Sequence, residues 1–187
     1  MNKKVGILKF GQFNDIFFAL KKRSGDEMEF FLLNVDDETL DINDFDGIVL
    51  PRGKSLEYSN LLLEARWADF LKKFLLSGKP ILTICGSLIV FAKDLGEQCE
   101  GRKSLRLVDI RVDNNYLNGF FDVDFVVGHC YQNCHFTDAP KISVLSERVE
   151  VLAFYQKDIV AIKDGHIFGY TFFDKTGMAY DDFLDCL

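Results

Sequence analysis

Cys85 stands at the junction of two apolar segments of different character. Residues 80–84 before it are typical of a buried strand, and residues 86–93 after it have the pattern of a helix. A sharp strand-to-helix turn of this kind, the nucleophile elbow, presents one reactive side chain and requires small neighbours. The partial positive charge at a helix N-terminus favours the thiolate form of a cysteine. The sequence therefore predicts Cys85 as a catalytic nucleophile; the alternative is a buried thiol with no chemical role.

A second loop is expected beside this cysteine. Residues 51–55, Pro-Arg-Gly-Lys-Ser, follow a short apolar strand predicted at 47–50. Ligands of open α/β sheets bind outside the carboxyl ends of the strands, so both loops would lie at one edge. The N–H groups of Gly53 and Gly86 are then the candidate oxyanion donors. The candidate residues for binding a small anionic or amide ligand are Arg52, Lys54 and Ser55. The alternative is that the two basic side chains are simply solvated.

The proton acceptor that such a nucleophile needs is not obvious. Two pairs, His129-Cys130 and Cys134-His135, form a compact cluster whose residue types can ligate zinc. In an extended segment two of the four side chains would point away, and no second ligand pair is evident, so we predict no metal. Either histidine could instead reach Cys85, and His129 is the candidate substitute base.

The elements that must position these residues follow from hydrophobic periodicity. In the N-terminal half, strands are expected at 5–10, 29–34, 47–50 and 80–84, and helices at 12–23 and 61–76. Repeated strand–helix units with buried strands predict an α/β fold of the flavodoxin-like type. Its central sheet would be mostly parallel, with helices on both faces.

After Gly96 the pattern changes to alternating apolar and polar residues. Antiparallel C-terminal strands are expected at 105–112, 122–127, 149–154, 158–163 and 166–173. Asp164-Gly165 predicts a hairpin with a type I′ turn, and residues 178–187 predict a short closing helix. No linker or repeat divides the 187 residues, 48% of which are hydrophobic. A single domain, 1–187, is therefore expected.

Composition limits the partners of the chain. The formal net charge of -7 and a pI near 5.0 argue against nucleic acid and against an anionic membrane surface. No apolar run approaches the roughly 20 residues that cross a bilayer, and the N-terminus lacks the apolar segment of a signal peptide. Five cysteines at irregular spacing do not form the pattern of a disulfide framework. We therefore expect a cytoplasmic protein without a cofactor, whose partners are small molecules or proteins.

Beyond these local patterns, the chain resembles class I glutamine amidotransferase domains, and most closely the glutaminase subunits of pyridoxal 5′-phosphate synthase. Residues 45–55 resemble the strand and Pro-Gly-Gly-Glu-Ser loop of that family, and residues 78–93 resemble its Gly-Lys-Pro strand and Thr-Cys-Ala-Gly-Leu elbow. Later segments match in order, at 108–115, 149–152, 159–161 and 169–172. The resemblance implies that Cys85 attacks the amide carbon of glutamine and that the released ammonia passes to a synthase partner.

The resemblance breaks at the residues that handle protons. The Phe-His-Pro-Glu motif of the family corresponds here to residues 172–175, so Phe173 replaces the histidine and Lys175 replaces the glutamate. Arg52 and Lys54 likewise replace a glycine and the glutamate of the family's loop. Phenylalanine cannot transfer a proton, and a lysine has the wrong charge to orient an imidazolium.

Two interpretations follow from this degraded triad. The first is a glutaminase-like protein that is impaired or inactive as a glutaminase and acts as a binding or regulatory subunit. The alternative is an active cysteine-dependent amidotransferase or hydrolase that releases ammonia from glutamine with a non-standard base. A more distant alternative is the neighbouring superfamily of chaperone and peptidase-like proteins, which also has a cysteine elbow.

Overall fold

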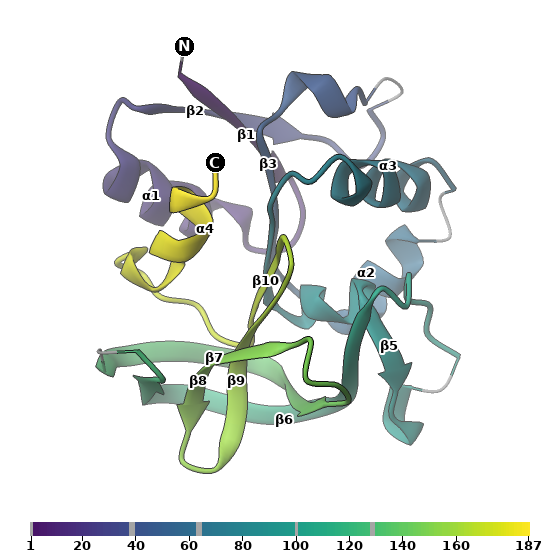
Figure 1. Cartoon of the computed structure of the whole chain (residues 1–187), viewed down its shortest axis with the longest axis vertical. Helices are drawn as coiled ribbons and strands as arrows, with labels where there is room; N and C mark the ends of the chain where they lie inside the picture. The colour runs from purple at the N-terminus through teal and green to yellow at the C-terminus, as the bar shows by residue number, and fades with distance from the viewer. Residues whose placement is uncertain (1, 38–39, 63–64, 100, 128–129) are drawn as a thin grey trace.

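A 10-stranded sheet forms the framework of the protein (Figure 1). The structure is a computed structural model that describes residues 2–37, 40–62, 65–99, 101–127 and 130–187. The strands follow the order β2-β1-β3-β4-β10-β9-β7-β6-β5, and β8 pairs with β6 and β9. One half of this sheet carries helices, and the other half curls on itself.

Parallel strands make up the helical half. These are β1 (Lys3–Leu8), β2 (Met28–Leu33), β3 (Gly47–Gly53), β4 (Ile81–Cys85) and β10 (Ile167–Tyr170). One face is covered by α1 (Phe13–Ser24) and α4 (Asp181–Asp185), and the other by α2 (Ser55–Leu61) and α3 (Ala65–Leu76) (Figure 1). All five residues of β4 are buried, as expected for a strand covered on both faces.

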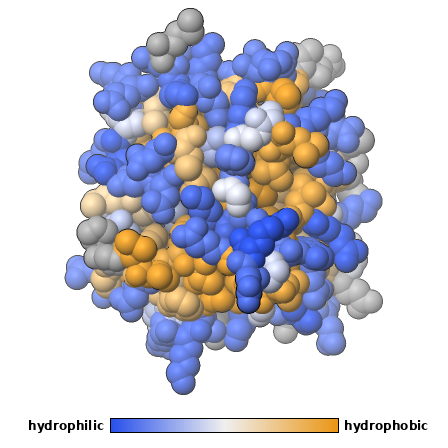
Figure 2. Space-filling model, viewed as in Figure 1, coloured by the Kyte–Doolittle hydropathy of each residue, from blue (hydrophilic) through white to orange (hydrophobic). Residues whose placement is uncertain are grey.

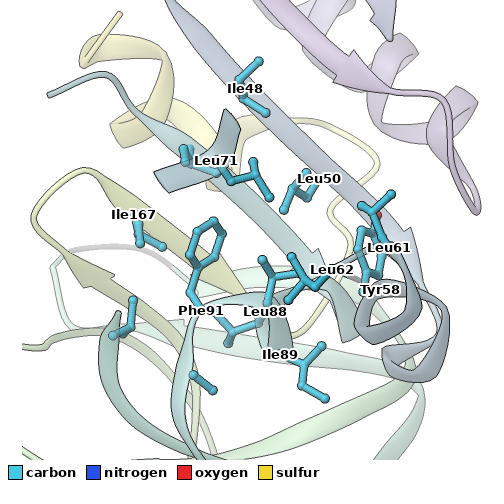
Figure 3. Close-up of a cluster of buried hydrophobic side chains, with 14 of the residues drawn as sticks. Ile48, Leu50, Tyr58, Leu61, Leu62, Leu71, Leu88, Ile89, Phe91 and Ile167 are labelled. Carbon is cyan, nitrogen blue, oxygen red and sulfur yellow. The ribbon is translucent and has the colours of Figure 1, made fainter. Parts of the chain in front are cut away.

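Figure 3 shows the core between β3 and the helices α2 and α3. Ile48 and Leu50 of β3 lie beside Leu71 of α3, and all three side chains are fully buried. The apolar residues of α3 recur at helical spacing and share this face, and Gly78, with φ 76°, follows where the helix ends. This packing holds β3 and β4 in place. The carboxyl ends of these two strands carry the predicted site.

The C-terminal half is a closed ring of antiparallel strands. β6 (Val108–Phe125) pairs with β7 (Cys130–Val144), β7 with β9 (Asp158–Asp164), β9 with β8 (Glu150–Tyr155), and β8 with β6. β5 (Ala92–Leu95) adds a parallel strand at the edge of β6. The α/β fold and the antiparallel C-terminal strands are confirmed. The expectation of a mostly parallel sheet is wrong, because the described residues of this half contain no crossover helix and its strands pair through hairpins and turns.

Several element boundaries differ from the sequence prediction. The helix expected at 86–93 is a short 3-10 helix, η2 (Gly86–Val90), followed directly by β5. The N–H groups of Leu105 and Leu107 donate to the carbonyl oxygens of Val90 and Phe91. In a longer helix these two oxygens would accept hydrogen bonds from within the helix. The helix predicted from residue 61 is preceded by α2, which begins at Ser55.

Two predicted strands, at 105–112 and 122–127, are one continuous strand. Register shifts near Leu117 and Gly119 accommodate, within this one strand, the residues whose pattern suggested a break between two strands. The segment 130–144, for which no strand was predicted, forms β7. Three short 3-10 helices complete the described chain: η1 (Ile42–Asp44), η3 (Glu97–Cys99) and η4 (Met178–Tyr180). The closing helix expected at 178–187 is thus η4 followed by α4.

The hairpin predicted at Asp164-Gly165 is confirmed, but the type of its turn differs from the prediction. Asp164 pairs with Ile167, so Gly165 and His166 form the two-residue loop. Gly165 has φ 58°, whereas His166 is not among the residues with positive φ. A type I′ turn needs positive φ at both central positions, so the predicted turn type is wrong.

Candidate functional site

Cys85 ends β4 in a turn that few side-chain-bearing residues adopt, with φ 53° and ψ -126°. The hydroxyl of Ser87 braces this turn. Its oxygen accepts the Ile84 N–H at 2.8 Å and lies 2.9 Å from the carbonyl oxygens of Leu50 and Ile84. The sharp turn predicted at Cys85 is confirmed by this backbone geometry.

The two predicted loops meet at the carboxyl edge of the sheet. Gly53, the last residue of β3, is the register partner of Cys85. A Cβ atom on Gly86 would collide with the carbonyl oxygen of Gly53 and lie 2.9 Å from the nitrogen of Ser55. Only glycine therefore fits at position 86 without displacing the neighbouring loop. Gly53 and Gly86 lie against each other as expected, and their role as oxyanion donors stays a prediction.

The environment of Cys85 disfavours the thiolate. The side chain is fully buried, and burial is the main cause that raises the pKa of its thiol to about 12. The charge of Arg52 and the backbone N–H of Thr137 act in the opposite direction, whereas Asp138 raises the pKa further. The expectation that the helix terminus would favour a thiolate is wrong. The helix is a single short 3-10 segment, and desolvation outweighs its dipole.

Arg52 lies at the centre of the site with a side chain that is only 8% exposed. Its Nη2 pairs with the Asp15 carboxylate at 2.6 Å. Its Nη1 donates to His135 Nδ1 at 2.6 Å and to Thr137 Oγ1 at 3.3 Å. The guanidinium carbon lies 5.3 Å from the ring centroid of Phe173. An external anion at Arg52, as the sequence predicts, would have to displace these partners.

His135 is held as a neutral acceptor. Because a guanidinium can only donate, Nδ1 of His135 must accept from Arg52, which places the ring proton on Nε2, 3.3 Å from Thr137 Oγ1. Burial and the Arg52 charge lower the pKa of His135, and Asp15 raises it. The ring also stacks on Phe120, with centroids 4.3 Å apart. In the described part of the chain no hydrogen bond joins His135 to Cys85.

Phe173 and His135 form a cross-strand pair. Each backbone N–H donates to the carbonyl oxygen of the other residue at 2.8 Å. Phe173 is 8% exposed, whereas Lys175 is exposed. Asp174, between them, is buried and accepts the N–H groups of Thr176 at 2.9 Å and Ala179 at 3.0 Å. The segment that carries the family's histidine and glutamate thus serves here to anchor β7 and the closing turn.

The remaining predicted residues are spread around this centre. Ser55 is buried at the start of α2, and the side chain of Lys54 is exposed. The N–H of Lys54 donates to the Glu57 carboxylate at 3.3 Å, which closes the first turn of α2. Residues 52–55 therefore lie in different environments, although they are adjacent in sequence: Arg52 is paired, Lys54 is exposed and Ser55 is buried.

The histidine–cysteine cluster is only partly described. His129 lies outside the described residues, so its candidacy as a base stays a prediction. Cys130 is exposed and Cys134 is buried, and burial raises the pKa of Cys134 to about 12. Within the described ranges no group of three His, Cys, Asp or Glu side chains is arranged to hold a metal ion. The five cysteines are free thiols.

Asp15 is the site residue that the sequence did not indicate. It lies in the first turn of α1, directly after the carboxyl end of β1, and so at the same sheet edge as Arg52. Acidic residues are common in first helical turns, so the sequence gave no reason to select Asp15.

Cavities of about 1130, 460 and 240 Å³ open elsewhere on the molecule, and Cys85 lines none of them.

No helix in the described ranges has both the length and the apolar character needed to cross a membrane.

Comparisons with known proteins agree with this architecture. A model of the SNO glutamine amidotransferase family matches residues 11–183. The pyridoxal 5′-phosphate synthase subunit PdxT of Thermococcus onnurineus is 29% identical over 179 residues, which cover 90% of this chain and 89% of that protein. The subunit of the same name from Streptococcus pneumoniae strain D39 is 31% identical over 166 residues, with coverage of 86% and 84%.

Solved structures share the fold at lower sequence identity. A glutamine amidotransferase crystal structure superposes with a TM-score of 0.77 at 22% identity and covers 97% of each chain. The structure of PurLQS from Thermotoga maritima gives a TM-score of 0.72 at 16% identity and covers 99% of each chain. The sequence resemblance is therefore confirmed, and the chain belongs to the SNO glutamine amidotransferase family.

Proposed function

We propose that this protein is a glutamine amidotransferase-like subunit that is impaired or inactive as a glutaminase and serves in binding or regulation. The observation that carries the proposal is Arg52, whose guanidinium lies against Phe173 at the position where the family resemblance implies a histidine. A guanidinium stays protonated at all physiological pH values, so it cannot act as a general base. The nucleophile position is kept, but the group beside it cannot accept its proton.

Two further features support impaired catalysis. Cys85 is buried with a pKa near 12, so only a minute fraction is thiolate at neutral pH. His135 is the nearest described imidazole to this region, and both of its ring nitrogens face other partners, Arg52 and Thr137. Activation of the thiol would require these contacts to rearrange.

A synthase-type protein is the proposed partner. The curated relatives are named as subunits of pyridoxal 5′-phosphate synthase. A chain that keeps the fold while losing proton transfer could still dock on such a subunit in the cytoplasm as one domain. A small anionic or amide ligand at Lys54 and Ser55 is part of the proposal, because Lys54 is exposed at the rim of the loop.

The test is ammonia release from glutamine. The parent and Cys85→Ala would be assayed alone and with a pyridoxal 5′-phosphate synthase subunit as partner. The proposal expects the parent to release ammonia no faster than Cys85→Ala in either condition. Turnover that depends on Cys85 and exceeds the variant by about tenfold or more, beyond any background, would overturn it.

Restoring the family residues provides a positive control. Arg52→Gly, Phe173→His and Lys175→Glu together remove the cation and rebuild the base with its orienting carboxylate. Ammonia release should rise only when all three changes are present with Cys85, and should vanish again on adding Cys85→Ala. A gain of this kind shows that the assay can detect activity on this scaffold.

The alternative function is an active amidotransferase in which His135 supplies the base. It is favoured by one observation, the position of His135 at this sheet edge beside Arg52, although its ring would have to leave its present partners to act as a base. If the parent shows turnover that depends on Cys85, His135→Ala should remove it under this alternative. Unchanged turnover in His135→Ala would leave His129 or a partner residue as the base.

A further inference from the structure

A groove separates the antiparallel ring from the C-terminal segment. It has a volume of about 1130 Å³ and runs between the adjoining ends of β6 and β7, strand β8, and the segment from Asp174 through α4. Figure 1 shows α4 above the ends of β6 and β7, on the same side of the molecule. Cys85 does not line this groove, so the groove is distinct from the site described above.

The groove has an apolar floor. Its apolar lining residues are Phe125, Val126, Val127, Val151, Leu152, Met178 and Ala179. Val126 is 59% exposed and Val127 is 82% exposed, although both are apolar. Figure 2 shows hydrophobic surface at the lower left of the view, beside the ends of β6 and β7. Exposed apolar residues that gather in a groove with a polar rim are a feature of interaction sites.

The rim of the groove is acidic. Carboxylates that line it are Glu150, Asp174, Asp181, Asp182 and Asp185, against two cations, Arg23 and Lys163. Arg23 is bound by Asp181 at 2.6 Å, and Lys163 faces Glu150 across the β8–β9 pair. In the described ranges no ion pair engages Asp182 or Asp185. The charge of Asp185 also interacts with Arg23. Asp174 is buried, but the other four carboxylates still outnumber the two cations. The groove therefore carries an excess of negative charge above an apolar floor.

A buried hydroxyl lies beneath this floor. Tyr170 is fully buried and stacks on Phe125, and in the described part of the chain its hydroxyl has no hydrogen-bond partner. Burial is the main cause that raises the pKa of Tyr170, and Asp182, Tyr131 and Asp181, which all line the groove, raise it further. Buried polar groups in native structures nearly always have a hydrogen-bond partner, so this hydroxyl marks an unusual place in the core directly below the groove.

We propose that this groove docks a segment of a partner protein whose apolar side chains are flanked by lysine or arginine. The apolar floor takes the apolar side chains, and Asp182 and Asp185 pair with the flanking cations. The volume of about 1130 Å³ is slightly above the range of about 300–1,000 Å³ typical of small-molecule pockets, which suits a peptide segment. The inference does not depend on whether the chain hydrolyses glutamine.

Two synthetic peptides test the chemistry of the occupant. One carries a central run of leucine and phenylalanine between lysine pairs, and the other keeps the lysines but replaces the central run with serine. Titration of labelled peptide with the full-length protein, followed by fluorescence anisotropy, should show saturable binding of the first peptide, with the serine peptide at least about tenfold weaker. Raising the ionic strength should weaken binding of the first peptide, because the rim charges are exposed.

Matched variants locate the binding site. Asp182→Lys with Asp185→Lys should weaken binding about tenfold or more, whereas Asp44→Lys with Asp69→Lys makes the same change in net charge away from the groove and should not. Val126→Ser with Val127→Ser should weaken binding similarly, and Leu76→Ser, at another exposed apolar residue, should not. All four replaced groups are exposed or line the open groove, so the variants are expected to fold.

Three outcomes would overturn the inference. These are failure of the parent to bind the apolar peptide, equal affinity for both peptides, or equal loss of binding in the groove variants and their controls. Because each readout is binding to a peptide, the result is separate from ammonia release. A protein inactive as a glutaminase could pass this test, and an active one could fail it.

Discussion

Arg52 and Phe173 are two departures from the family pattern that touch each other. The guanidinium lies 5.3 Å from the ring centroid, an arrangement that contributes about 0.5–2 kcal/mol depending on burial. The ion pair of Arg52 with Asp15 adds less, because the Asp15 side chain is 49% exposed and solvent screens it. Replacing either residue removes this contact, although Arg52 would keep its partners Asp15, His135 and Thr137.

Arg52→Ala should make Cys85 accessible to alkylation. In the parent, iodoacetamide should modify the exposed Cys130 and Cys186 at least about tenfold faster than Cys85, whose thiol is buried and protonated. Removing the guanidinium takes away a buried side chain near the thiol, but also a charge that lowers the thiol pKa. Any gain in labelling of Cys85 therefore reports access to the sulfur rather than easier ionisation. Peptide mass spectrometry of a labelling time course would follow all three sites in one sample.

The control for this variant is Arg23→Ala. It removes a surface arginine that is paired with Asp181, and it lies away from the cysteine. If Cys85 gains the same reactivity in both variants, labelling reports unfolding of the whole protein rather than opening at Arg52.

Tyr170→Phe should stabilise the free protein. The change keeps the ring and removes a buried hydroxyl that has no hydrogen-bond partner among the described residues, so the free energy of unfolding should rise by about 1 kcal/mol. Tyr180→Phe is the matched control, because the Tyr180 hydroxyl accepts the Asp174 N–H at 2.7 Å and its loss should destabilise. Urea denaturation of the two variants should give changes of opposite sign; a loss of stability in Tyr170→Phe would contradict the assignment.

At the scale of elements, the strand-to-turn unit at Cys85 could be predicted because its signals are local. An apolar run, a small residue and a sheet edge are all visible in residues 80–87. The helix that should follow could not be excluded, because it depends on a distant segment: residues 105–107 take the carbonyl oxygens of Val90 and Phe91. Long-range pairing overrides local propensity at this point.

The strand β7 was missed for a related reason. Its apolar residues do not alternate strictly, since exposed and buried positions shift where the register slips against β6. The same shift brings His135 opposite the segment after β10 and beside Arg52. The candidate site could therefore be predicted for Cys85, Gly53 and Gly86, but the cluster of Asp15, Arg52 and His135 depends on tertiary pairing.

Gly86→Ala should destabilise the elbow element. A Cβ atom at this position would collide with the backbone of the loop that follows β3, which cannot give way as a side chain can. We expect a loss of about 3 kcal/mol in the free energy of unfolding, from overpacking. Gly101→Ala is a useful comparison, because it has open space and only the strain of its φ of 79°, a cost of about 1 kcal/mol. Equal losses in the two variants would show that the elbow tolerates the extra atom.

At the scale of the whole molecule, the buried thiol couples stability to pH. The pKa of Cys85 is raised from an ordinary value of 9.0 to about 12 in the folded protein. Between these values the unfolded chain releases this proton and the folded protein keeps it, so stability is full below pH 9 and falls as pH rises toward 12. Cys85→Ala lacks this contribution.

Urea denaturation would measure the free energy of unfolding of the parent and of Cys85→Ala at about pH 8 and at about pH 10.5. The parent should lose about 2 kcal/mol more than Cys85→Ala over this range, because a pH unit corresponds to about 1.4 kcal/mol per proton. Parallel pH profiles would mean that the sulfur ionises as readily in the folded protein as in the unfolded chain.

The cross-strand pair of His135 and Phe173 places an imidazole directly across from the position where the family resemblance implies a histidine. Exchanging the two side chains, by His135→Phe with Phe173→His, conserves composition and the backbone hydrogen bonds of the pair, and leaves an aromatic ring to stack on Phe120. One exchange across a single pair of backbone hydrogen bonds therefore moves the imidazole to that position without adding a chemical group.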